Sequence, residues 1–114
     1  MPTVYASQNR RLVSFEQGEN DVREYAVDWS GVEGVTFPIT AQEWSVDAGT
    51  ASVSGEAIDA NGRITRATIQ LPQAGRAYLT NKVTTTDGQE ISQAIAVSAI
   101  SVAAPPRDYA RGTW

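Results

Sequence analysis

The sequence contains neither cysteine nor histidine. Without cysteine there is no disulfide, no thiolate metal site and no cysteine nucleophile. Without histidine, the chain lacks the side chain that does most general acid–base chemistry near neutral pH. A domain without disulfides fits a reducing cytoplasm, or a particle assembled there, and nothing in the sequence indicates a cofactor.

Long apolar runs and excess basic charge are also missing. No run approaches the ~18 residues of a membrane span, and residues 1–15 lack the apolar region of a signal peptide. The net charge is −4, from 9 basic and 13 acidic residues, which disfavours a general affinity for DNA or RNA. We therefore expect neither a membrane nor a nucleic acid as partner.

The sequence is rich in short strand patterns separated by turn residues. Asn61-Gly62 and Asp87-Gly88 are hairpin signals, the first of them typical of a type I′ turn. No window has apolar residues at helical spacing. This regular alternation of short strands and turns predicts one all-β domain, an immunoglobulin-like β-sandwich of about seven strands with extended N- and C-terminal arms. The predicted strands are 25–29, 39–46, 50–58, 63–71, 76–86 and 89–102, with a further short one at 12–15.

Alternation along these strands predicts the core. Trp44 lies mid-strand in the first half of the chain, where an immunoglobulin-like sandwich carries its core tryptophan. Leu71, Gly75 and Tyr78 have the spacing of a tyrosine corner. With Tyr78 inward, Val83 falls out of phase, so we expect either a β-bulge near Asn81 or an inward Lys82. The predicted core is Trp29, Trp44, Ile69, Tyr78, Ile95 and Val97.

The two ends of the chain differ from its middle. We expect residues 1–22 to form an N-terminal arm, 23–102 the sandwich and 103–114 a C-terminal arm. Pro105 and Pro106 follow the last strand and cannot donate to its ladder. The arms carry residue types that dominate protein interfaces. The predicted interface residues are Tyr5, Phe15, Arg107, Tyr109, Arg111 and Trp114.

Catalysis and ligand binding have weaker candidates. A Ser–Lys pair would need Lys82, the single lysine, and no serine is marked as its partner. Paired carboxylates could hydrolyse a glycoside, but the acidic residues fit turns and solvated faces better. Residues 59–62 begin like a calcium-binding loop but lack its later acidic positions. A calcium ion bound between loops therefore remains an alternative. Tyr5 or Phe37 could stack on a sugar. The candidate carboxylates are Asp28, Glu43, Asp47, Asp59, Asp87 and Glu90.

Four stretches together resemble a known family. They are YAVDWS (25–30), ITAQEWSVDAG (39–49), LPQAGRAYLTNKVTTTDGQE (71–90) and the alternating strand that follows. They resemble small immunoglobulin-like virion proteins of tailed bacteriophages, of the fibre–tail adaptor type. The resemblance covers about residues 25–102. The matching positions are Tyr25, Asp28, Trp29, Ser30, Ile39, Trp44, Val46, Gly75, Tyr78, Thr85 and Gly88.

The resemblance implies a structural protein rather than an enzyme. Such a protein would lie in the tail or head–tail region of the phage particle, in several symmetric copies. Its partners would be tail, adaptor, portal or fibre subunits. The family commonly has a longer loop with a G-D-x-I lead-in, where this chain has residues 31–40 with Pro38 before Ile39. A carbohydrate-binding or capsid-decorating module is the alternative.

Overall fold

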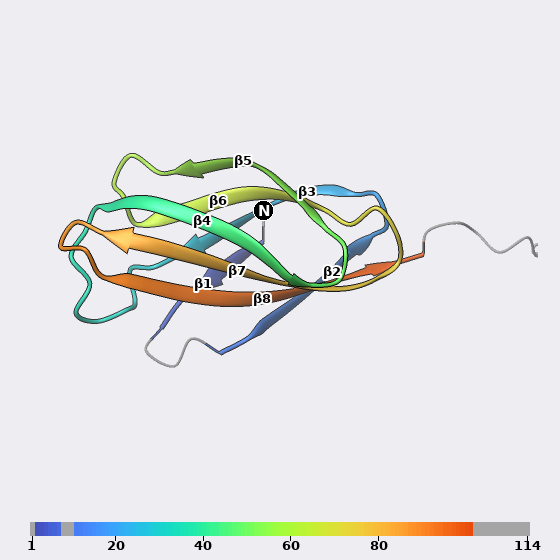
Figure 1. Ribbon diagram of the computed structural model, residues 1–114, viewed down its shortest axis with the longest axis horizontal. Coiled ribbons are helices and arrows are strands. Elements are labelled where there is room, and N and C mark those ends of the chain that lie inside the picture. Colours follow the sequence, from blue (N-terminus) through green and yellow to red (C-terminus); the bar gives the residue numbers. More distant parts are fainter. Residues whose placement is uncertain (1, 8–10, 102–114) are drawn as a thin grey trace, which may run out of the picture.

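The computed structural model describes residues 2–7 and 11–101, and in them the chain is all-β. Two four-stranded sheets pack face to face, which confirms the predicted immunoglobulin-like sandwich (Figure 1). The described strands number eight rather than about seven. They are β1 (Thr3–Tyr5), β2 (Val13–Gly18), β3 (Val22–Asp28), β4 (Ile39–Ala48), β5 (Ser52–Ile58), β6 (Ile64–Gln70), β7 (Gly75–Thr85) and β8 (Glu90–Ile100).

The strand order is β1-β3-β6-β5 in one sheet, sheet A, and β2-β8-β7-β4 in the other, sheet B. β1 runs parallel to β3 and β2 runs parallel to β8, whereas the other pairs are antiparallel. β4 and β5 are the last strands of their sheets, and the Gln42 amide nitrogen on β4 donates to the Ala57 carbonyl oxygen on β5 at 2.7 Å. These two edges therefore lie on one side of the sandwich.

Most of the described N-terminal region belongs to the sandwich, which corrects the expected arm over residues 1–22. β1 adds an edge to sheet A and β2 adds an edge to sheet B. Val4 and Ala6 are buried in the common core. β1 belongs to sheet A and β2 to sheet B. Each of these short segments therefore turns only one face toward the core. The C-terminal arm, 103–114, lies outside the described residues.

The core predicted from alternation is largely correct. Trp29, Ile69, Ile95 and Val97 are fully buried, and Trp44 is buried as well. Each of these side chains lies on the inward face of its strand or, for Trp29, directly after it. Burial of several aromatic and β-branched side chains between the sheets supplies the main driving force for folding.

Tyr78 is the exception, because its side chain faces solvent with 39% of its surface exposed. β7 pairs with β8 without interruption from Gly75–Ala99 to Thr84–Glu90, so β7 has no bulge against β8. Leu79 and Asn81 face inward instead, and Lys82 does not. The tyrosine-corner prediction is therefore wrong, and so are the bulge near Asn81 and the inward Lys82 that it required.

Replacing Tyr78 with alanine is expected to change the free energy of unfolding by less than about 1 kcal/mol, since little of its ring is in the core. Leu79→Ala is the matched control on the next residue, where the side chain is fully buried. That control should cost about 2–5 kcal/mol. Urea unfolding of both variants measures the difference. A Tyr78→Ala cost equal to that of Leu79→Ala would contradict the outward placement.

A hydrogen-bonded network of polar side chains crosses the core between the sheets. The Trp29 indole N–H donates to the Thr65 hydroxyl at 3.0 Å, and that hydroxyl donates to the Asn81 side-chain oxygen at 2.6 Å. The Asn81 amide nitrogen donates to the Gln42 side-chain oxygen at 3.3 Å. The Trp44 indole N–H donates to the same Gln42 oxygen at 2.9 Å. Both core tryptophans are thus tied to one network that joins β6 to β7 and β4.

Candidate interaction surfaces

The predicted interface residues do not share one surface. Tyr5 lies on edge strand β1 and is 74% exposed. Phe15 is half-buried, and its ring packs against Tyr25 with 5.4 Å between ring centroids. Phe15 thus belongs to the border of the core, where it supports β2. The other four predicted residues, Arg107, Tyr109, Arg111 and Trp114, lie outside the described residues.

Four of the charged candidates for catalysis, Glu43, Asp59, Lys82 and Glu90, are engaged in ion pairs. Asp59 accepts two hydrogen bonds from the Arg66 guanidinium, at 2.7 Å and 2.9 Å. Lys82 lies between Glu43 and Glu90, with nitrogen–oxygen distances of 3.7 Å and 3.8 Å. Paired in this way, these groups hold neighbouring strands together. In the described part of the chain, no three acidic residues gather as a metal site would require.

Three connections between strands meet at one end of the sandwich. The Ile39 backbone N–H donates to the Gly62 carbonyl at 2.9 Å, and the Thr86 hydroxyl donates to the Pro38 carbonyl at 2.6 Å. The Arg63 guanidinium lies 4.4 Å from the centroid of the Phe37 ring. A half-buried ring covered by a cation is a poor platform for a sugar, so Phe37 serves mainly to join the loops.

The turn over residues 59–62, at this end, is not of the expected type I′. Asp59 and Gly62 do close a hairpin, with the Gly62 N–H donating to the Asp59 carbonyl at 2.8 Å. Gly62 has a φ of 69°, but Asn61 is not among the residues with positive φ. A type I′ turn would need positive φ at both central positions. The loop therefore combines an ordinary turn with one left-handed glycine.

Asp87 ties the β7–β8 turn to the β3–β4 connection. Its carboxylate accepts hydrogen bonds from the Thr85 hydroxyl and, at 3.1 Å, from the Thr36 hydroxyl. The bond from Thr85 is the main cause that holds the pKa of Asp87 below its ordinary value. Hydrogen bonds to the ionised form favour that form, so Asp87 is suited to being a fixed acceptor rather than a proton donor.

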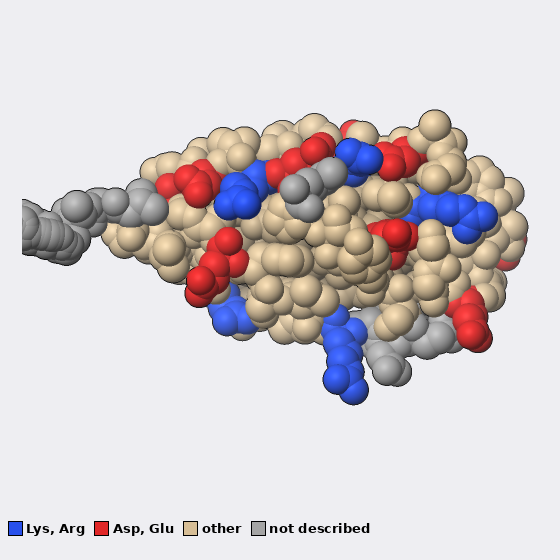
Figure 2. Space-filling view, turned by 180° about the vertical axis from the view of Figure 1, so that it is seen from behind, with Lys and Arg blue, Asp and Glu red and all other residues tan. Residues whose placement is uncertain are grey.

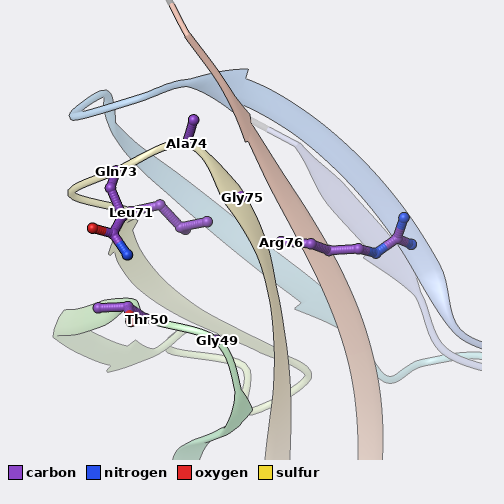
Figure 3. Close-up of a pocket in the computed structure, with 7 residues that line it drawn as sticks. All are labelled: Gly49, Thr50, Leu71, Gln73, Ala74, Gly75 and Arg76. Atoms are coloured by element: carbon purple, nitrogen blue, oxygen red, sulfur yellow. The ribbon is translucent and has the colours of Figure 1, made fainter.

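A shallow hollow of about 110 Å³ lies at the opposite end (Figure 3). Figure 3 shows that the Arg76 side chain points away from the other lining residues and across the neighbouring strand. None of the seven lining residues is acidic, so the hollow offers no carboxylate pair for hydrolysis. The lining residues are Gly49, Thr50, Leu71, Gln73, Ala74, Gly75 and Arg76.

Arg76 instead helps to build the outer face of sheet B. Its guanidinium lies 5.3 Å from the centroid of the Tyr78 ring, and it donates to the Ser14 hydroxyl on β2 at 3.0 Å. Ala96 lies between these strands, in register with both Tyr78 and Ser14. Because the Arg76 side chain bridges from β7 to β2, Ala96 is buried although it faces outward.

The free edge of β4 carries a regular pattern of polar groups. Glu43, Ser45 and Asp47 are exposed and alternate along the strand. Asp47 accepts hydrogen bonds from Ser45 and from Thr80 on the outer face of sheet B. β4 contains no proline and pairs regularly with β7 from Ala41 to Val46, with register shifts between Ile39 and Ala41 and between Val46 and Ala48. The outer backbone groups of the regular stretch can serve as a template for another strand.

On the face seen from behind, charges of one sign do not gather into a single patch. Seen from behind, acidic and basic side chains are intermixed over the surface of the described residues (Figure 2). Such a surface gives little long-range steering toward one class of charged partner. Residues 2–7 and 11–101 also include no helix that is long and apolar enough to cross a membrane.

Comparisons with known proteins agree on the fold. No protein-family model and no curated protein matches the sequence. A cysteine protease inhibitor from Entamoeba histolytica aligns with 88% of this chain and 97% of its own, at a TM-score of 0.55 and 16% identity. A 2,6-sialyltransferase from Photobacterium sp. JT-ISH-224 aligns with 87% of this chain, at a TM-score of 0.51 and 7% identity.

A third similar structure is an endo-fucoidan hydrolase of glycoside hydrolase family 107, at a TM-score of 0.51 and 12% identity over 80% of this chain. This chain spans only 18% of the sialyltransferase and 13% of the hydrolase. At such low identities the similarity shows a shared sandwich and nothing about activity. One fold of this kind supports many unrelated functions.

Proposed function

We propose that this chain is a structural, non-enzymatic protein of a bacteriophage particle. It serves as an adaptor of the tail or head–tail region and docks fibres or neighbouring subunits through its sheet edges and C-terminal arm. It occurs in several symmetric copies assembled in the host cytoplasm. The sequence resemblance to fibre–tail adaptor proteins suggests the particle, and the surface of the domain suggests the mode of docking.

The open edge of β4 is the observation that carries the docking role. An edge strand offers a row of backbone N–H and C=O groups, and an extended segment of another chain can add to it as a further strand. Soluble domains usually blunt such an edge with proline, a bulge or a short strand. β4 is the longest edge strand of the described sandwich, with 10 residues. Its pairing with β7 is regular from Ala41 to Val46 and shifts register at both ends of that stretch, so its middle is the part that suits docking.

The C-terminal segment supplies the second part of the proposal. β8 ends at Ile100, whose side chain is half exposed, and the following residues include Tyr109 and Trp114. Among the described residues, the core is formed by side chains between Val4 and Ala99. Aromatic side chains such as those of Tyr109 and Trp114 are of the type that anchors in a partner.

The experiment that tests this role is deletion of residues 105–114 from this protein's gene in the phage genome. Since the arm is proposed to dock on another chain rather than on its own core, the truncated protein should keep the unfolding midpoint of the full chain. Its amount in purified particles should fall at least about tenfold, the equivalent of about 1.4 kcal/mol of docking energy. Thr113→Ala, within the same segment, is the control and should be incorporated normally. Normal incorporation of the truncated chain would refute the role of the arm.

A further inference from the structure

The acidic pattern on β4 limits what can pair with its edge. Two copies of β4 paired antiparallel about Ser45 would place Glu43 of each directly opposite Asp47 of the other. Like charges directly opposite each other destabilise a strand pair. The pattern therefore protects β4 against a second β4, while it favours a strand with basic side chains at the same spacing.

The C-terminal segment has that spacing. Arg107, Tyr109 and Arg111 follow one another at every second position, as Glu43, Ser45 and Asp47 do on β4. In an extended conformation, every second side chain lies on the same face. From Arg107 to Trp114 there is no proline, so each residue has a backbone N–H to donate.

We propose that residues 107–111 of one copy add as a fifth strand to sheet B of a neighbouring copy, along the free edge of β4. In the antiparallel arrangement Arg107 faces Asp47, Tyr109 faces Ser45 and Arg111 faces Glu43. The inference rests on the proposed function, because it needs neighbouring copies, and it names the site and the partner. Backbone hydrogen bonds supply the affinity, and the two arginine–carboxylate pairs fix the register.

Among the edge strands of the described sandwich, β4 fits this partner best. β1 has three residues and no acidic side chain. β2 has one acidic side chain, Glu16. β5 also has one, Glu56. The pairing of β5 with β6 shifts register between Ser54 and Ala57, as that of β4 with β7 does between Val46 and Ala48, beside Asp47. Only β4 combines length with two acidic side chains at the spacing of the two arginines.

The absence of cysteine allows a direct test by disulfide trapping. Full-length Ser45→Cys and Tyr109→Cys proteins are mixed and oxidised mildly. Directly opposed residues on paired strands have Cβ atoms about 4.5–5.5 Å apart, close enough for a disulfide after a small adjustment. The yield of the mixed dimer, linked between positions 45 and 109, should exceed that of either symmetric dimer at least about fivefold. Pairing of the arm with β4 raises the effective concentration of these two thiols.

Ser54→Cys on β5 replaces Ser45→Cys in the control mixture, because Ser54 is also an exposed serine and lies on the edge strand of the other sheet. That mixture should show no such excess. Equal yields from Ser45→Cys and Ser54→Cys would overturn the proposal. It would also be overturned if a single chain with both Ser45→Cys and Tyr109→Cys formed only an intramolecular disulfide, since the arm would then occupy its own edge.

Charge reversal gives an independent readout by sedimentation of the full chain. The edge variant Glu43→Arg/Asp47→Arg and the arm variant Arg107→Glu/Arg111→Glu should each self-associate about tenfold more weakly than wild type. Mixing them restores opposite charges at every contact, so association should return. Glu24→Arg/Glu56→Arg on the outer face of sheet A is the control for changed net charge, and it should associate as wild type does. Failure of the mixture to recover would contradict the pairing.

The two proposals fail in different ways. If deletion of residues 105–114 abolishes incorporation but the mixed 45–109 disulfide does not form, the arm docks on another surface and only the β4 site is wrong. If the truncated chain is incorporated normally, the docking role of the arm is wrong, whatever the disulfide experiment shows.

Discussion

Replacing Asn81 with alanine is expected to lower the free energy of unfolding by about 3 kcal/mol, as the sum of a small cavity and lost buried hydrogen bonds. The Asn81 side chain is fully buried and joins Thr65 on sheet A to Gln42 and the Glu43 carbonyl on sheet B. Without it, the fully buried Thr65 hydroxyl loses its acceptor, and the half-buried Gln42 side chain loses a donor. Thermal or urea unfolding measures the cost.

A double-mutant cycle with Thr65→Val tests whether the network acts as a unit. Thr65→Val removes the hydroxyl that links Trp29 to Asn81, while keeping nearly the same side-chain volume. Because both substitutions break the same bond, their costs should be non-additive by at least about 0.5 kcal/mol. Thr68→Val on the outer face of the same strand is the control and should change stability by about 0.5 kcal/mol or less. Additive costs for Thr65 and Asn81 would contradict a shared network.

Replacing Gly62 with alanine is expected to cost about 2–4 kcal/mol, since it combines backbone strain with a steric clash. Gly62 has a φ of 69°, and an added Cβ would lie 2.1 Å from the Pro38 Cβ. Its backbone also bonds to Asp59 and Ile39, so the residue cannot move without disturbing two connections.

Gly88→Ala separates the two causes. Gly88 has a φ of 86°, but nothing lies within 4 Å of an added Cβ. Alanine there should cost only about 1 kcal/mol, the price of the left-handed conformation. The difference between the two variants, measured by urea unfolding, reports the contact between Gly62 and Pro38. Equal costs would show that this contact does not hold the loops together.

The fold could be predicted from the sequence because its main strands alternate clearly. The predicted segments 39–46, 63–71 and 76–86 lie within two residues of β4, β6 and β7 at each end. β1 could not be predicted, because three residues show no periodicity and their burial depends on a parallel partner far along the chain. For β2 the apolar alternation was visible only over residues 12–15.

The inner face of β7 shows where alternation misleads. Its buried positions include Asn81, and a polar residue in the core is not expected unless its partners are known. Those partners, Thr65 and Gln42, lie on other strands, so the sequence alone could not show them. Assigning Tyr78 to the core instead put the first half of the strand out of phase, and that is why the prediction needed a bulge near Asn81 or an inward Lys82.

The candidate surfaces were only partly visible in the sequence. Tyr5 is exposed, and its role as an interface residue stays a prediction, whereas Phe15 packs at the border of the core. The pattern of Glu43, Ser45 and Asp47 was present in the sequence, but it gains meaning only once β4 is known to be an edge strand. Strand order depends on contacts between distant segments, and local patterns do not report them.

The most direct test of the docking role is a reconstruction of the assembled particle at a resolution that shows side chains. We expect several symmetric copies of this chain in the tail or head–tail region, with residues 105–114 of each copy against another chain. Residues 107–111 should run along β4 of a neighbouring copy. A particle that lacks the chain, or one in which residues 105–114 fold back onto their own domain, would contradict it.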